Sequence, residues 1–141
     1  MQYDLGAEEV LATAVRIEQE GAEFYLRASE IMKEPEARRE LEKLAGMERE
    51  HEETFADLIS RASMLSGKNL GSTPSVQENE TDAILAAFAS GKILSLTAAS
   101  SKKLTGNETT SDICRMAIAL EKDSIVFYLA LAEYVSGEFD R

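Results

Sequence analysis

The sequence contains a single cysteine, Cys114, among its 141 residues. One thiol excludes an internal disulfide bond, and without a Cys-x-x-Cys pair there is no zinc ribbon or other four-thiolate metal module. We expect Cys114 to be a small buried apolar residue, as free cysteines usually are. The sequence also lacks tryptophan and has only two prolines, so few residues interrupt regular structure.

Basic residues are scarce as well. Fifteen Lys and Arg stand against 26 Asp and Glu, which gives a formal net charge of -11. Nucleic-acid phosphates and anionic membranes repel such a surface, so we expect neither as a partner. No apolar run reaches the roughly 20 residues of a membrane span. The N-terminal residues 1–4 lack the basic and apolar regions of a signal peptide, and we expect a cytoplasmic protein.

Helix-forming residues are abundant, and no stretch alternates as a strand does. We predict an all-α fold with a single domain over residues 1–141, because this length is enough to bury one core. The first two helices are expected over 7–32 and 35–65, with Pro35 in a first turn. Their short connection at 33–35 requires an antiparallel hairpin, which occupies residues 7–65.

The rest of the chain is predicted to cross over and then form one more long helix. Residues 66–110 are the crossover, with a short helix at 81–89 capped by Thr81 and a second piece continuing to Lys103. The last helix is expected over 111–136, with Gly137 just past its end. Since this last helix is apolar nearly all round, we expect it to be covered on more than one side.

Two segments of the chain repeat each other at an offset of 103 residues. Residues 14–20 and 117–123 are similar, and each segment is followed by a Phe-Tyr pair that ends at Tyr25 or Tyr128. Glu18 and Glu121 each precede their tyrosine by seven residues. The repeat indicates that the first and last helices play the same role in two halves of one architecture.

Three glutamates lie on largely apolar helix faces. The residues three, four and seven positions from Glu18 carry no charge. Glu48 has one charged neighbour of this kind, Glu52, and the only histidine, His51, follows on the same face. Glu121 is also framed by uncharged residues. The same test assigns three other glutamates to solvated faces: Glu20, Glu23 and Glu50.

A carboxylate in a dry core is unfavourable unless a cation compensates it. Carboxylate oxygens together with an imidazole nitrogen suit iron, manganese or zinc. The sequence therefore predicts a metal site at Glu18, Glu48, His51 and Glu121. The alternative is that these glutamates are protonated or reach solvent, and that the two tyrosines are ordinary core aromatics.

Segments 18–25, 48–51 and 117–128 together resemble the rubrerythrin branch of the ferritin-like superfamily, whose four-helix bundles hold two irons. The resemblance implies that Glu18 and Glu121 are single-glutamate ligands and that Glu48 and His51 are a Glu-x-x-His pair. It also implies that Tyr25 and Tyr128 hydrogen-bond to ligands across the site.

The sequence departs from that family at several points. Ser124 stands where a rubrerythrin carries an extra glutamate, and the rubredoxin-like cysteine module is absent. The chain ends at Arg141, where the family continues into a fourth helix with a second Glu-x-x-His. Three explanations stay open. Two chains pair their hairpins and complete the ligand set, the natural protein is longer, or the site is incomplete.

The resemblance implies a non-haem di-iron protein with peroxide- or oxygen-linked iron redox chemistry, of peroxidase or ferroxidase type. Manganese or zinc are alternative metals. The expected partners are metal ions, peroxide or oxygen, and a second copy in a homodimer or higher homo-oligomer. The alternative function is a non-catalytic helical scaffold with an incomplete or vacant metal site. The sequence leaves open the substrate, the electron donor and whether the protein is an enzyme.

Overall fold

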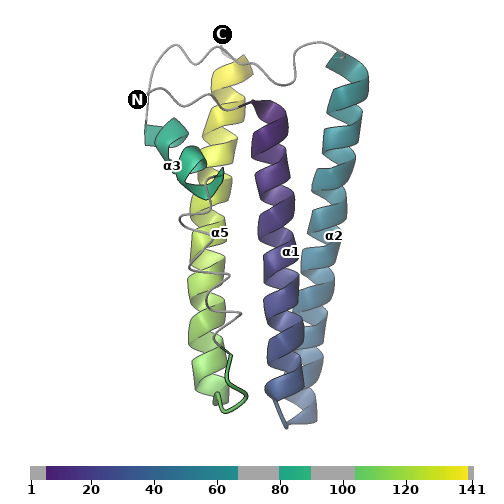
Figure 1. The fold of residues 1–141 in the computed structure, drawn as a ribbon, viewed down its shortest axis with the longest axis vertical. Helices are drawn as coiled ribbons and strands as arrows, with labels where there is room; N and C mark the ends of the chain where they lie inside the picture. Colours follow the sequence, from purple (N-terminus) through teal and green to yellow (C-terminus); the bar gives the residue numbers. More distant parts are fainter. Residues whose placement is uncertain (1–5, 67–79, 90–103, 140–141) are drawn as a thin grey trace.

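The computed structural model describes residues 6–66, 80–89 and 104–139. In these residues every regular element is a helix: α1 (Ala7–Ile31), α2 (Pro35–Ser66), α3 (Glu80–Ala89) and α5 (Thr110–Phe139). The three long helices run side by side, and the short α3 lies against α5 (Figure 1). The predicted all-α fold is confirmed. None of the described helices combines the length and apolarity that crossing a membrane requires.

The hairpin of α1 and α2 forms as the sequence predicts, with the two helices packed closely along their length (Figure 1). Acidic residues Glu8 and Glu9 lie in the first turn of α1, where the helix dipole favours negative charge. Pro35 is the first residue of α2, a position at which its missing N–H leaves no hydrogen bond unmade. The turn between the helices therefore has a local cause in the sequence.

Two predicted helix ends are wrong. Gly137 lies inside α5 and not beyond it, and Thr81 lies inside α3, which already begins at Glu80. A glycine ends a helix where its backbone takes positive φ, and within the described residues Gly106 alone does so. Most of the predicted crossover, including the helical piece through Lys103, falls on residues 67–79 and 90–103, outside the described residues.

Two apolar clusters form the core, and they follow one another along the helices. The first consists of Val10, Ala14, Ile17, Leu85, Phe88, Phe127 and Ala130. The second consists of Phe24, Tyr25, Ala28, Met32, Leu41, Ala45, Ile113 and Leu120. On α1 the change of cluster falls within 17–24, and on α5 within 120–127. Glu18 and Glu121 lie in these two intervals, so their carboxylates belong to a polar layer between two apolar ones.

The short helix α3 is tied to both of its long neighbours. Arg16 of α1 donates hydrogen bonds from Nη2 to the backbone oxygens of Phe88 (2.7 Å) and Ala89 (3.3 Å). The Phe88 ring meets Phe127 of α5 edge to face, with 5.1 Å between the ring centroids. These carbonyls are at the C-terminal end of α3, where the last backbone oxygens of a helix have no intrahelical N–H donors. The guanidinium supplies them.

One face of α5 is not covered by the described residues. Ile118, Ile125 and Leu129 are 55, 57 and 67% exposed. They recur at helical spacing, so they form one stripe along the helix. As expected for an apolar helix, α5 has neighbours on more than one side, since α1 and α3 both pack on it, but the described residues leave this stripe uncovered.

Candidate metal centre

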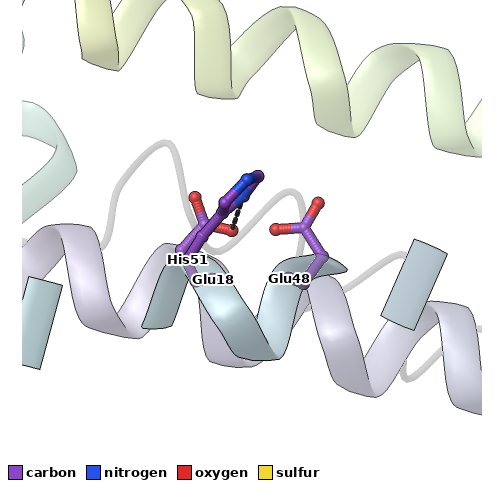
Figure 2. A group of neighbouring side chains, drawn as sticks. All are labelled: Glu18, Glu48 and His51. Atoms are coloured by element: carbon purple, nitrogen blue, oxygen red, sulfur yellow. Dashed lines mark ion pairs between the residues drawn. The ribbon is translucent and has the colours of Figure 1, made fainter. Parts of the chain in front are cut away.

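Three of the four predicted metal ligands come together. Glu18 of α1 and Glu48 and His51 of α2 each place one ligand atom within 4.8 Å of the others. Their side chains converge from the two helices and point toward the ribbon of α5 (Figure 2). The spacing of three residues puts Glu48 and His51 on one face of α2. Nδ1 of His51 lies 3.4 Å from Oε2 of Glu18.

Glu18 is the buried member of this group. Its side chain is 3% exposed, whereas Glu48 is half-buried and the His51 side chain is 54% exposed. Oε2 of Glu18 is fully buried and accepts no hydrogen bond from the residues that the structure describes. A buried carboxylate oxygen without a donor is costly, and a cation bound there would remove that cost. The donor set of two carboxylates and one imidazole therefore fits a transition-metal ion.

Two tyrosines hold the glutamates of the opposite long helix. The Tyr128 hydroxyl of α5 donates to Oε1 of Glu18, and the Tyr25 hydroxyl of α1 donates to Oε1 of Glu121 over 2.6 Å. Each half of the sequence repeat thus supplies a tyrosine to the other half. The hydrogen bonds that the family resemblance implies are present, and the binding of metal by these carboxylates stays a prediction.

The surroundings shift the protonation of these groups. Burial raises the pKa of Glu18, and the Tyr128 hydrogen bond and the neighbouring His51 lower it only in part. Burial and the hydrogen bond to a carboxylate raise the pKa of both Tyr25 and Tyr128. The two hydroxyls consequently keep their protons and act as donors across the physiological pH range.

Aromatic packing shapes the open side of the centre. The Tyr128 ring stacks on Phe55 of α2, with 5.5 Å between the centroids and 8° between the planes. Together with Glu18, His51 and Thr54 these rings line a hollow of about 270 Å³. A small molecule that enters this hollow meets the carboxylate of Glu18 and the imidazole of His51.

The fourth predicted ligand, Glu121, stands apart. It does not belong to the three-residue group, and it is half-buried beneath the Tyr25 hydroxyl. Its negative charge is near enough to contribute to the raised pKa of Glu18. Glu121 therefore lies beside the cluster and does not share its ligand geometry.

Two minor expectations of the sequence are wrong. Cys114 is exposed, and Glu20 is half-buried, while Glu23 and Glu50 are exposed as predicted. α1 has neighbours on more than one side, so the face that carries Glu20 is partly covered as well. Sequence reasoning also missed Gly21, which lies against Glu48. A glycine in the interior of a helical pattern was the available signal.

An all-helical bundle that gathers glutamates and a histidine between its helices defines the class of ferritin-like carboxylate metal proteins. The family model for rubrerythrin matches residues 3–83, more than half of this chain. The chain therefore belongs to the rubrerythrin family, as its motifs indicate. The match contains Glu18, Tyr25, Glu48 and His51 and does not extend to α5. No curated protein and no solved structure matches the chain.

Proposed function

We propose that this protein binds iron at the cluster of Glu18, Glu48 and His51 and carries out peroxide- or oxygen-linked iron redox chemistry. The observation that carries the proposal is the buried Oε2 of Glu18, which lacks a hydrogen-bond donor among the described residues and faces Nδ1 of His51 at 3.4 Å. Membership of the rubrerythrin family supports iron as the metal. Manganese and zinc are compatible with the same donor set.

The residues of the chain have separate tasks in this proposal. Iron would supply the one-electron chemistry that side chains lack. Tyr128 fixes Oε1 of Glu18, so Oε2 keeps its direction toward the cluster. Phe55 stacks on Tyr128 and holds that donor in place. The hollow beside His51 would admit a molecule as small as peroxide or dioxygen.

A two-metal centre needs more ligands than one such cluster offers. We infer a homodimer in which a second copy covers the exposed stripe of α5 and adds its own Glu18, Glu48 and His51, which gives four carboxylates and two imidazoles in all. The stripe flanks the centre, because Ile118 and Ile125 lie within one turn of Glu121 on the same helix.

Metal analysis tests the proposal directly. The metal-free protein would be loaded with Fe²⁺, Mn²⁺ or Zn²⁺ under anaerobic conditions, freed of excess metal and analysed for bound metal. We expect the wild type to retain metal, and Glu18→Ala and His51→Ala to lose it. Glu50→Ala is the matched control, because Glu50 is exposed on the same helix. A wild type that retains none of the three metals contradicts the proposal.

The reaction needs its own measurement. We expect the iron-loaded protein to consume hydrogen peroxide as its ferrous iron is oxidised, and the absorbance of the ferric product measures the rate. The rate of the Glu18→Ala variant should fall to that of free iron. Equal rates for the two proteins would mean that the centre does not carry the reaction.

The second candidate function is a non-catalytic helical scaffold with a vacant site. The exposure of His51 favours it, because an imidazole that is more than half solvated holds a metal less firmly than a buried one. If the protein is a scaffold with a vacant site, loading with any of the three metals should leave its thermal stability unchanged. A tightly bound metal raises the stability, since it binds the folded state alone.

A further inference from the structure

Gly21 lies on α1 one turn beyond Glu18 and faces α2. It is buried, and a Cβ atom built on it would lie 3.2 Å from Cδ, 3.3 Å from Oε2 and 3.5 Å from Cγ of Glu48. The first two of these distances are tighter than ordinary van der Waals contact, and the third is an ordinary contact. A Cβ at position 21 would therefore crowd the carboxylate of Glu48, which would have to move by a few tenths of an ångström.

The backbone gives no reason for a glycine at this position. Gly21 is in the middle of α1, and among the described residues only Gly106 has a positive φ. Glycine inside a helix lowers stability relative to alanine, because its unfolded chain has more conformational freedom to lose. Something other than helix formation accounts for Gly21, and the three atoms nearest to its missing Cβ all belong to the Glu48 side chain.

We infer that Gly21 is a positioning residue that sets the place of the Glu48 carboxylate in the metal cluster. The inference rests on the proposed metal-binding function. An added methyl group would displace the carboxylate by a few tenths of an ångström. Metal–ligand distances tolerate about 0.2 Å, so this displacement is large enough to weaken a bond to metal. Figure 2 shows why it matters: Glu48 forms one side of the group and reaches toward Glu18 and His51.

The sequence repeat shows that this arrangement is specific to α1. The residue of α5 that corresponds to Gly21 is Ser124, three residues beyond Glu121 as Gly21 is three beyond Glu18. Ser124 has a side chain, and its hydroxyl donates to the backbone oxygen of Leu120 in its own helix. Only the copy of the repeat that faces Glu48 has glycine at this position.

The first test is metal affinity, measured by titrating metal-free protein with Co²⁺ and following the visible absorbance of the bound ion. We expect Gly21→Ala to weaken binding by about ten-fold or more, the range seen when the support of a metal ligand is removed. The control is Gly46→Ala on α2, because a Cβ at position 46 meets nothing within 4 Å. Gly46→Ala should leave the affinity unchanged.

The second test needs no metal. In metal-free protein, Gly21→Ala should raise the melting temperature less in the wild-type background than in a Glu48→Ala background, where the methyl group has room. The gain in the Glu48→Ala background should match that of Gly46→Ala. Such a coupling between two sites reports their contact and not a general effect on the fold.

The outcomes distinguish a failure of the positioning role of Gly21 from a failure of the proposed metal-binding function. If the wild type binds Co²⁺ and Gly21→Ala binds it equally well, the positioning role is wrong. If Gly21→Ala gains the same melting temperature in both backgrounds, the contact with Glu48 has no energetic weight and the inference is also wrong. If the wild type binds no Co²⁺, Fe²⁺, Mn²⁺ or Zn²⁺, the proposed function itself fails, and the ligand-positioning role fails with it.

Discussion

At the scale of single residues, the two carboxylate oxygens of Glu18 have different surroundings. Oε1 accepts the hydrogen bond of Tyr128, while Oε2 is buried near His51 without a donor from the described residues. One oxygen fixes the side chain and the other keeps its lone pairs. A metal ligand needs this division, because one oxygen must be held in place by a hydrogen bond while the other keeps its lone pairs for the metal.

The pH dependence of metal-free protein should report the burial of Glu18. Burial raises the pKa of this carboxyl above its ordinary value of 4.5. Its contribution to stability is therefore fully present below pH 4.5 and is lost as the pH rises through the raised pKa. We expect Glu18→Gln to be more stable than the wild type at neutral pH, with a difference that shrinks below pH 4.5, in urea unfolding of metal-free samples.

The control for this pH dependence is Glu50→Gln, which changes an exposed carboxyl on α2. Its stability should follow that of the wild type across the pH range. A wild type that is more stable than Glu18→Gln at neutral pH would show that the described neighbours compensate the charge of Glu18 fully.

The hydrogen bond from Tyr128 to Glu18 should make a measurable contribution to the free energy of unfolding. Tyr128→Phe removes the only hydroxyl that donates to Oε1 of Glu18 among the described contacts and keeps the stack on Phe55. Hydrogen bonds to charged groups contribute about 1.5–3 kcal/mol, so the metal-free variant should be destabilised by that amount in urea unfolding at neutral pH. In a Glu18→Ala background the same substitution should have almost no effect, and an undiminished effect there would contradict the assignment.

At the scale of elements, α5 begins at a reciprocal cap. Thr109 Oγ1 accepts a hydrogen bond from the Asp112 N–H (3.1 Å), and Asp112 Oδ2 accepts one from the Thr109 N–H (2.9 Å). Just before this cap, the carboxylate of Glu108 accepts hydrogen bonds from the backbone N–H groups of Thr105 and Gly106. The start of α5 is thereby fixed, and with it the register that brings Glu121 and Tyr128 to the centre.

The cap can be tested without touching the centre. Thr109→Ala should destabilise the protein by about 0.5–2 kcal/mol in urea unfolding, the range for loss of a helix cap. Backbone hydrogen bonds from Thr109 lower the pKa of Asp112 below its ordinary value of 3.8. The contribution of Asp112 is thus present above pH 3.8 and is lost as the pH falls through the lowered pKa. The destabilisation caused by Asp112→Asn should therefore shrink toward pH 2, and a loss that is equally large at pH 2 would contradict the ionic origin of this contribution.

At the scale of the whole molecule, an acidic chain exposes an apolar stripe. A net charge of -11 opposes association of two copies, while Ile118, Ile125 and Leu129 favour it. Salt screens the repulsion and leaves the burial of apolar surface in place. A dimer of this protein should therefore become tighter as the salt concentration rises.

Light scattering coupled to size-exclusion chromatography measures this association. We expect a wild-type dimer at tens of micromolar protein, strengthened by salt, and a monomeric Ile125→Glu/Leu129→Glu variant with unchanged helix content. Leu26→Glu, an exposed apolar position on α1, is the control and should stay dimeric. A wild type that is monomeric at high salt would contradict the proposed pairing.

Much of the fold could be predicted because it depends on local spacing. Pro35 and the three-residue connection fix the hairpin, and residues three to four apart place Glu48 and His51 on one face. The ends of helices were less predictable. Gly137 lies within α5, since a glycine ends a helix only if its backbone turns to positive φ, and sequence alone does not decide that.

The sequence by itself determined the helices, the repeat and the candidate ligands, because each follows from side-chain type and periodicity. Tertiary structure alone decided which atoms meet. It brought His51 to Oε2 of Glu18, paired each tyrosine with the glutamate of the other repeat, and left Glu121 beside the cluster. It also set Glu48 over Gly21, since contacts between helices depend on their relative height and rotation, which no single helix encodes.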